Sequence, residues 1–206
     1  SEQVVYVAIG AMVEDGAGNA IAASNATFTG ADINATTVTF SPANGASNVA
    51  VSSNVTITLN EAIRKIDDSE ITNTNVDALI TLKNSNSSGS DIAFDATINS
   101  GKTLITINPT NDFSSSQVVY SAIGATVEDD ANNAITAISS IFTVTDIVSP
   151  TIASGSLSTD NSYIDITMNE GVYNTNGGSG ALEKTDFIIT FAQNSGNATA
   201  ASISSI

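Results

Sequence analysis

An internal repeat limits the fold of this chain more than any other feature of its sequence. Residues 3–21 read QVVYVAIGAMVEDGAGNAI, and residues 117–135 read QVVYSAIGATVEDDANNAI. Over residues 1–32, about 20 of the 32 positions recur at an offset of 114. Self-similarity at a fixed period is typical of a tandem array of like modules. We therefore predict a module of roughly 114 residues, which is long enough for one hydrophobic core.

A second repeat extends the array toward the end of the chain. The segment IDITMNE at 164–170 matches VTITLNE at 55–61, and DFIITF at 186–191 matches DALITL at 77–82, both at an offset of 109. Two matches in one register are hard to obtain by chance. The repeats predict three parts, joined by a short linker at 147–150: the C-terminal strands of one unit (1–31), a complete unit (32–146), and the N-terminal part of a third unit (147–206).

The complete unit has the pattern of a β-sandwich. Val55, Ile57 and Leu59 alternate with threonines, which is the period-2 pattern of a half-buried strand. Similar short apolar segments recur between turn signals such as Asn44-Gly45. Seven such strands indicate an antiparallel sandwich. The expected strands span 36–40, 55–59, 78–83, 92–98, 104–107, 117–127 and 138–145, and the first part of the chain adds 3–13 and 26–29.

The inward positions of these strands predict the core of the complete unit. Large apolar side chains at alternate positions should meet between the two sheets. The expected core residues are Val38, Phe40, Val55, Ile57, Leu59, Ile80, Leu82, Ile92, Phe94, Ile105, Ile107, Val119, Ile123, Val127 and Phe142.

Two stretches resemble the bacterial Ig-like domain of S-layer and surface proteins. Residues 41–63, SPANGASNVAVSSNVTITLNEAI, resemble its opening half. Its closing signature is an aromatic strand, then V-x-D-x-x-G-N-x-[LI], then a T-F strand, and it resembles residues 6–28 and 120–142. The first copy keeps the Gly18-Asn19 pair of the signature, whereas the second has Asn132-Asn133. A left-handed turn tolerates this change, because Asn also adopts positive φ.

The resemblance implies tandem immunoglobulin-like, seven-stranded antiparallel β-sandwiches, of which two of the three units are incomplete here. It also implies a non-catalytic structural module of a long repetitive bacterial protein, extracellular or at the cell surface, such as an adhesin stalk or an S-layer or matrix component. The expected partners are the neighbouring Ig-like repeats of the same protein. Folds of this kind imply neither an enzyme nor a shared ligand.

Charge and composition exclude several other functions. The formal net charge is −16, and the chain has only five basic residues. Nucleic acid is therefore not an expected partner, because no basic stripe exists to neutralise phosphates. The absence of Cys and His excludes disulfides, imidazole metal sites and His-activated nucleophiles. No apolar run approaches the roughly 20 residues of a membrane helix, so membrane insertion is not expected in this segment.

The predicted topology gathers acidic residues at one end of the sandwich. Successive strands alternate in direction, so the loops 60–76, 99–102 and 128–137 should emerge together. These loops, with the linker, bring carboxylates that Ca²⁺ could bind together with backbone and Asn oxygens. We predict calcium that stiffens the junction between units, bound by Asp32, Glu61, Asp67, Asp68, Glu70, Glu128, Asp129 and Asp130. In the following junction, Asp146 takes the part of Asp32 and Glu170 that of Glu61.

Other interpretations of the same residues stay open. The acidic loops could simply be solvated, because they lack the dense D-x-D-x-D-G spacing of calcium loops. Paired carboxylates also occur in glycoside hydrolases. However, no apolar cleft is indicated, and an array seldom needs a catalytic site in each unit, so we expect no enzyme. The alternative function is a self-assembling extracellular fibre, in which the ends of different chains complement one another strand by strand.

Overall fold

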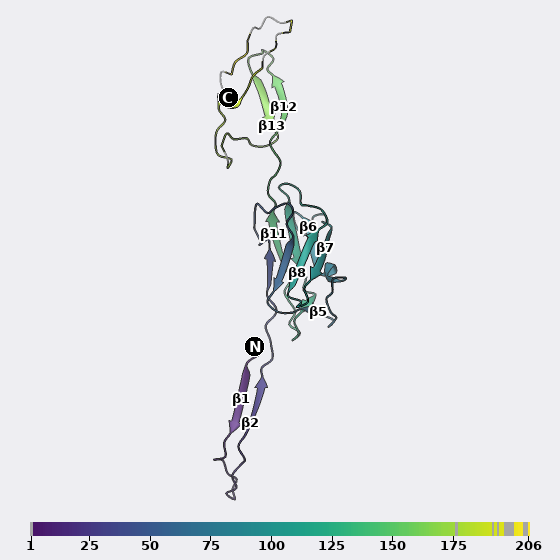
Figure 1. Cartoon of the computed structure of the whole chain (residues 1–206), viewed down its shortest axis with the longest axis vertical. Helices are drawn as coiled ribbons and strands as arrows, with labels where there is room; N and C mark the ends of the chain where they lie inside the picture. The colour runs from purple at the N-terminus through teal and green to yellow at the C-terminus, as the bar shows by residue number, and fades with distance from the viewer. Residues whose placement is uncertain (1, 176, 191, 193, 196–199, 204–205) are drawn as a thin grey trace. The chain divides into compact units, whose positions relative to one another are not determined.

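The computed structural model describes residues 2–175, 177–190, 192, 194–195, 200–203 and 206. Within these residues the chain is all-β, apart from two short 3-10 helices, η1 (Val76–Leu79) and η2 (Lys184–Asp186) (Figure 1). This confirms the predicted fold class. No helix in the described part of the chain is long and apolar enough to span a membrane. The chain divides into two compact units, Ser1–Ile147 and Val148–Ile206; the three-part division stays a prediction.

Two antiparallel sheets form the sandwich within the first unit (Figure 1). Their order is β3-β4-β8-β7 in one sheet and β11-β9-β6 in the other. Each of these seven strands overlaps one of the seven segments expected from sequence. Their bounds are β3 Val38–Ser41, β4 Val55–Leu59, β6 Ile80–Asn84, β7 Phe94–Ile98, β8 Leu104–Pro109, β9 Val118–Ile123 and β11 Ile138–Thr143.

One expected strand, 117–127, is wrong as a single element. It divides into β9 and a separate short strand, β10 (Val127–Glu128), which pairs with β5 (Arg64–Lys65). The ladder of β9 ends at Ile123 because Ile123 pairs with Ile80, the first residue of β6. Beyond this point η1 replaces the partner strand. Sequence patterns did not indicate β5 or β10, because a two-residue strand has no measurable alternation.

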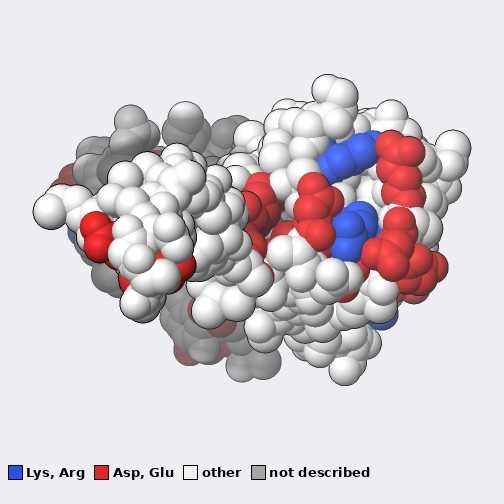
Figure 2. All heavy atoms as spheres, turned by 90° about the horizontal axis from the view of Figure 1, so that it is seen from below, with Lys and Arg blue, Asp and Glu red and all other residues white. Residues whose placement is uncertain are grey.

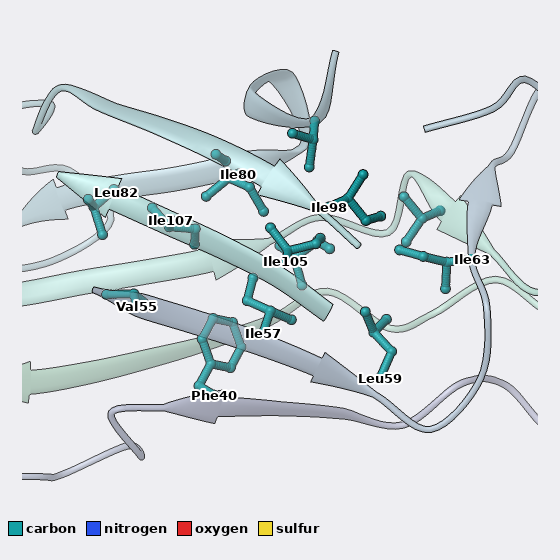
Figure 3. Close-up of a cluster of buried hydrophobic side chains, with 14 of the residues drawn as sticks. Phe40, Val55, Ile57, Leu59, Ile63, Ile80, Leu82, Ile98, Ile105 and Ile107 are labelled. Carbon is teal, nitrogen blue, oxygen red and sulfur yellow. The ribbon is translucent and has the colours of Figure 1, made fainter. Parts of the chain in front are cut away.

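The core lies between the two sheets, as the alternation predicted (Figure 3). Twelve of the fifteen expected core residues are buried, and Val38, Ile92 and Phe94 are half-buried against them. Burial of each large side chain contributes about 1.5–3 kcal/mol. Loops, η1 and β7 supply further buried residues that the core prediction did not include: Ile63, Ile71, Val76, Ala96, Ile98, Phe113, Ile135 and Val144.

The first repeated segment forms a hairpin of β1 (Val4–Ile9) and β2 (Ser24–Thr29). Its side chains are mostly exposed, in contrast to those of β9 and β11. The loop between the strands is closed by the carboxylate of Asp15, which accepts from the backbone N–H groups of Ala17 and Asn19. Gly18 adopts φ +84° in this loop, and Asn132 adopts φ +69° at the equivalent position. The expected left-handed turn is therefore confirmed in both copies.

The second unit contains β12 (Ile152–Leu157) and β13 (Ile164–Met168), which pair antiparallel. The Thr151 N–H donates to Asn169 Oδ1 at 2.6 Å, as the Thr37 N–H donates to Asn60 Oδ1 at 2.6 Å in the sandwich. Residues 187–190, which repeat the start of β6, are not in a strand, and residue 191 lies outside the described residues. β6 is held by β9, and the described part of this unit offers no strand of that type.

Candidate functional site

Three loops meet at the end of the sandwich that carries β5 and β10, as the topology predicted. The Ile63 N–H donates to the Lys102 carbonyl at 3.2 Å, and Lys102 Nζ donates to the Ile71 carbonyl at 2.7 Å. The pairing of β5 with β10 ties the third loop to the first. Figure 2 shows acidic side chains grouped around basic ones on the face seen there.

Arg64 organises one group of these acidic residues. Its guanidinium contacts Glu128 at 3.2 Å, Asp68 at 3.0 Å and Asp130 at 3.7 Å, and it donates to Asn132 Oδ1 at 3.1 Å. Glu128 is only 6% exposed, so its charge depends on this partner more than the exposed carboxylates do. Three of the predicted metal ligands therefore surround a cation of the protein itself.

Two further predicted ligands have other roles. Glu70 pairs with Lys102 at 2.8 Å, and this hydrogen bond and charge lower the pKa of the Glu70 carboxyl. Asp67 closes a local turn, accepting from the hydroxyl of Ser69 at 2.5 Å and from its backbone N–H at 3.1 Å. The Ser69 hydrogen bonds lower the pKa of Asp67. Glu70 therefore links the loops 60–76 and 99–102, whereas Asp67 stabilises its own loop.

The remaining predicted ligands at this end form a compact trio. One carboxylate oxygen from each of Asp32, Glu61 and Asp129 lies within 4.8 Å of the other two. Asp129 is buried, and the other two are half-buried. The trio lines a shallow hollow together with Asp130 and Ala131. Three oxygens at this separation could contribute to the six to eight that surround Ca²⁺.

A five-residue turn fixes Asp129 within the trio. Asp129 Oδ1 accepts from the backbone N–H groups of Ala131 at 2.8 Å and Asn133 at 2.9 Å, and Oδ2 accepts from Asn133 Nδ2 at 3.0 Å. Burial alone would raise the pKa of Asp129, but the hydrogen bonds from Asn133 and Ala131 and the charge of Arg64 together lower it. The carboxylate is therefore held ionised in a fixed orientation.

Asp32 lies in the segment between β2 and β3, and Glu61 lies just after β4. Asp32 Oδ1 accepts from the Asn34 N–H at 3.0 Å, and the Asp32 carbonyl accepts from Asn133 Nδ2 at 3.3 Å. Glu61 lies two residues after the end of β4, next to Asn60, whose side-chain oxygen accepts from the Thr37 N–H just before β3. Sequence reasoning missed Asn60 and Asn133 as positioning residues, although the repeat signalled both.

Asp146 is not part of the trio, and Glu170 belongs to the second unit. Asp146 Oδ1 accepts from Ser115 Oγ at 2.6 Å, and the same hydroxyl oxygen accepts from the Ile147 N–H at 2.9 Å. Ser115 thereby holds the chain where it leaves the sandwich. Glu170 follows β13 in the second unit, at the position that Glu61 has after β4. The parts that these two residues take in a following junction stay predictions.

Known proteins were compared with this chain by family and by structure. A family model described as bacterial Ig-like domain matches residues 32–145. Among solved structures, the crystal structure of CopC from Methylosinus trichosporium OB3b aligns with a TM-score of 0.36 and 14% identity, covering 53% of this chain and 92% of that one. No curated protein matches the chain.

Proposed function

The chain belongs to the bacterial Ig-like domain family through residues 32–145, and on this premise we propose that it is a non-catalytic, load-bearing module of a bacterial surface or secreted protein. Its place in such a protein is that of a repeat in an adhesin stalk, an S-layer or an extracellular matrix. Membership of the family fits an extracellular location. The neighbouring repeats of the same protein are its proposed partners.

One observation carries this proposal: both ends of the sandwich are tied to its body. At the entry, Asn133 holds the Asp32 carbonyl. At the exit, Ser115 contacts both Asp146 and Ile147. Because seven alternating strands place entry and exit at opposite ends, a pulling force would cross the whole sandwich (Figure 1). Such anchoring favours a module that transmits tension over one that only links other domains.

Single-molecule stretching of the full chain tests this proposal. Residues 32–146 should unfold in one cooperative event, and extension at about 3.3–3.6 Å per residue predicts that roughly 380–410 Å of extended chain is released. Ser115→Ala should lower the unfolding force, whereas Ser88→Ala, which removes a hydroxyl from an exposed loop, should not. Gradual extension without a discrete event would contradict a load-bearing role.

We further propose that Ca²⁺ stiffens the entry end through Asp32, Glu61 and Asp129. Carboxylate oxygens are the ligands that Ca²⁺ prefers, and this trio offers three of them on a scaffold fixed by the Asp129 turn. An ion there would join the linker residue Asp32 to two loops of the sandwich. Local motion of the linker would then fall, while the sandwich itself would gain stability by mass action.

Calorimetric titration and thermal melts test the calcium proposal. If binding has the affinity common in extracellular modules, 10 mM Ca²⁺ should stabilise the sandwich by about 1.4–2.7 kcal/mol. The double variant Asp32→Asn/Glu61→Gln should lose this gain. The control variant Asp68→Asn removes an acidic charge of the Arg64 group, which lies outside the trio. This variant should keep the stabilisation by Ca²⁺. Equal responses of the two variants, or no response of the natural chain, would exclude the trio as the site.

A second candidate function is self-assembly into an extracellular fibre. Its proposed basis is the addition of a strand of one chain to an uncovered edge strand of another. Uncovered strands of this kind are templates for pairing with another chain. Light scattering of the full chain over a range of concentrations separates this candidate from a purely monomeric module.

A further inference from the structure

One edge of the four-stranded sheet is closed by side chains. β7 is the terminal strand of that sheet, beside β8. The Ala96 N–H donates to Asp77 Oδ1 at 2.8 Å, and the Ile98 N–H donates to Asn73 Oδ1 at 2.8 Å. In an antiparallel ladder, the N–H groups of alternate residues point away from the partner strand, and these are the groups that a further strand would use. Both acceptors belong to residues 70–79, here called the covering segment.

The covering segment is fixed to the sandwich on both sides of Asn73. Ile71 and Val76 are fully buried in the hydrophobic core. The Ile71 carbonyl also accepts from Lys102 Nζ at 2.7 Å. Because Val76 directly precedes Asp77, the same anchors hold both acceptor side chains against β7.

The other terminal strands of the sandwich are closed in different ways. Beside β11, the Gly45 N–H donates to the Ile141 carbonyl at 2.7 Å, and beside β6, the Ile92 N–H donates to the Leu82 carbonyl at 3.0 Å. β3 has only four residues and leads into Pro42, which has no N–H to donate. Short strands, prolines and covering loops are all means of preventing pairing between sheet edges. At β7, side-chain oxygens serve this purpose, so substitution can remove them without breaking a backbone ladder.

An uncovered β7 would match the same strand of a second copy. Two identical edges in antiparallel orientation each offer outward N–H groups to the outward carbonyls of the other. The other terminal strands of that copy are closed by backbone or are short, as described above. The Asp77 carboxylate adds a further obstacle, because a charged side chain at a sheet edge opposes the approach of another strand.

We propose that Asn73 and Asp77 form an autoinhibitory contact, which keeps this module from pairing with a second copy of the chain, β7 against β7. Their side-chain oxygens occupy the N–H groups through which that pairing would begin. The inference is independent of the load-bearing and calcium proposals, because neither involves β7. It restricts the fibre candidate, since strand addition at β7 first requires displacement of the covering segment.

Amide hydrogen exchange of the full chain, followed by NMR, tests the contact. The double variant Asn73→Ala/Asp77→Ala removes both acceptors. At low chain concentration, the Ala96 and Ile98 amides should exchange about tenfold faster or more, while the Ile107 amide in the inner strand β8 keeps its protection. At high concentration, light scattering should show a species of twice the 20.9 kDa chain mass. The Ala96 and Ile98 amides should then regain protection, because a partner strand covers them.

A matched control removes the same two types of side chain elsewhere. Asp95 and Asn108 are exposed and lie opposite each other on β7 and β8. The variant Asp95→Ala/Asn108→Ala therefore makes the same change in net charge and leaves the acceptors of the covering segment in place. Its exchange rates and its mass should equal those of the natural chain at each concentration.

The single variant Asn73→Ala provides the test if the double variant does not fold. It removes one acceptor, so Ile98 alone should lose protection while Ala96 keeps it. Unchanged exchange at Ile98 in this variant would overturn the role of the side chains. The proposed pairing would be overturned by a double variant that keeps the mass of the natural chain at every concentration. Larger species without renewed protection at Ala96 and Ile98 would overturn it as well.

Discussion

The hairpin of β1 and β2 and the pair of β9 and β11 have closely similar sequences in different surroundings. The first pair forms a two-stranded sheet by itself, whereas the second belongs to a three-stranded sheet that faces another sheet. Pairing register is the same in both. Local sequence therefore specifies the hairpin, and the surrounding layers specify the burial.

The loop that joins each pair of strands makes the same point in more detail. Asp15 and Asp129 accept hydrogen bonds from the same positions of their turns, at distances of 2.8–3.0 Å. The Asn19 side chain and backbone lower the pKa of Asp15, although that carboxyl is exposed. A turn that forms alike with and without a sandwich around it is determined by its own residues. It can therefore place an acidic ligand without help from the core.

The largest difference between the two copies should come from a buried charge. Ile123→Asp places a carboxylate in a site that is 1% exposed, at a cost comparable to the whole stability of about 5–15 kcal/mol of a domain. We expect the cooperative urea transition of the sandwich, followed by circular dichroism, to disappear. Ile9→Asp should leave that transition unchanged. A normal transition in Ile123→Asp would show that the register of β9 is wrong.

Truncation of an aromatic side chain should give a smaller difference in stability between the two copies. Phe142 packs edge to face on Phe113, with ring centroids 5.7 Å apart, so Phe142→Ala should destabilise the sandwich by about 3–5 kcal/mol. Phe28→Ala should change it by less than about 0.5 kcal/mol in dilute solution. Urea midpoints of the full chain measure both. If the loss of stability in Phe28→Ala grows with chain concentration, another copy of the chain covers the hairpin.

Substitutions in the two acidic turns should give a still smaller difference in the stability of the sandwich. In Asp129→Asn, the new amide nitrogen meets Asn133 Nδ2, another donor, and the Arg64 group loses a nearby negative charge. We expect the sandwich to lose about 1–3 kcal/mol. Asp15→Asn, in the exposed copy of the turn, should leave the sandwich transition in place. Equal effects of the two changes would mean that the surroundings of Asp129 contribute nothing to its role.

The lowered pKa of Asp129 predicts that the effect of Asp129→Asn on stability depends on pH. Because the pKa of folded Asp129 is lowered, its ionised form is favoured by folding. This contribution is fully present above the unfolded pKa of about 3.9 and is lost as the pH falls through the folded pKa. The difference in urea midpoint between the natural chain and Asp129→Asn should therefore shrink below about pH 4. A difference that stays constant down to pH 2.5 would exclude the charge as its cause.

The sequence predicted the sandwich well because its main signals are local or repeated. Alternation identified β4 and β7, and the repeat identified β1, β2, β9 and β11. It failed where pairing between distant residues decides the structure. The split at Ile123 depends on where β6 begins, and Ile71 is buried in a loop that looked polar. Neither fact has a periodic signature.

The candidate site was predicted in composition but not in arrangement. Strand direction brought the acidic loops to one end, and that expectation needed only topology. How the carboxylates divide between Arg64, Lys102 and the trio depends on side-chain distances that no spacing in the sequence encodes. Asn133 could have been found, because a side chain repeated within a turn motif often holds the turn.

The smallest expected effect has the opposite sign and concerns one position where the copies differ. β1 has Val7 where β9 has Ser121, and the Ser121 hydroxyl is buried without a hydrogen-bond partner among the described residues. Ser121→Val should therefore stabilise the sandwich by about 1 kcal/mol, provided that the larger side chain packs, and Ser121→Ala tests the loss of the hydroxyl alone. Ser140 lies opposite and donates to the Pro42 carbonyl at 3.1 Å. Ser140→Ala should instead destabilise by a similar amount, because that carbonyl loses its donor. Urea midpoints that move in the same direction for the two alanine variants would contradict this assignment of hydrogen bonds.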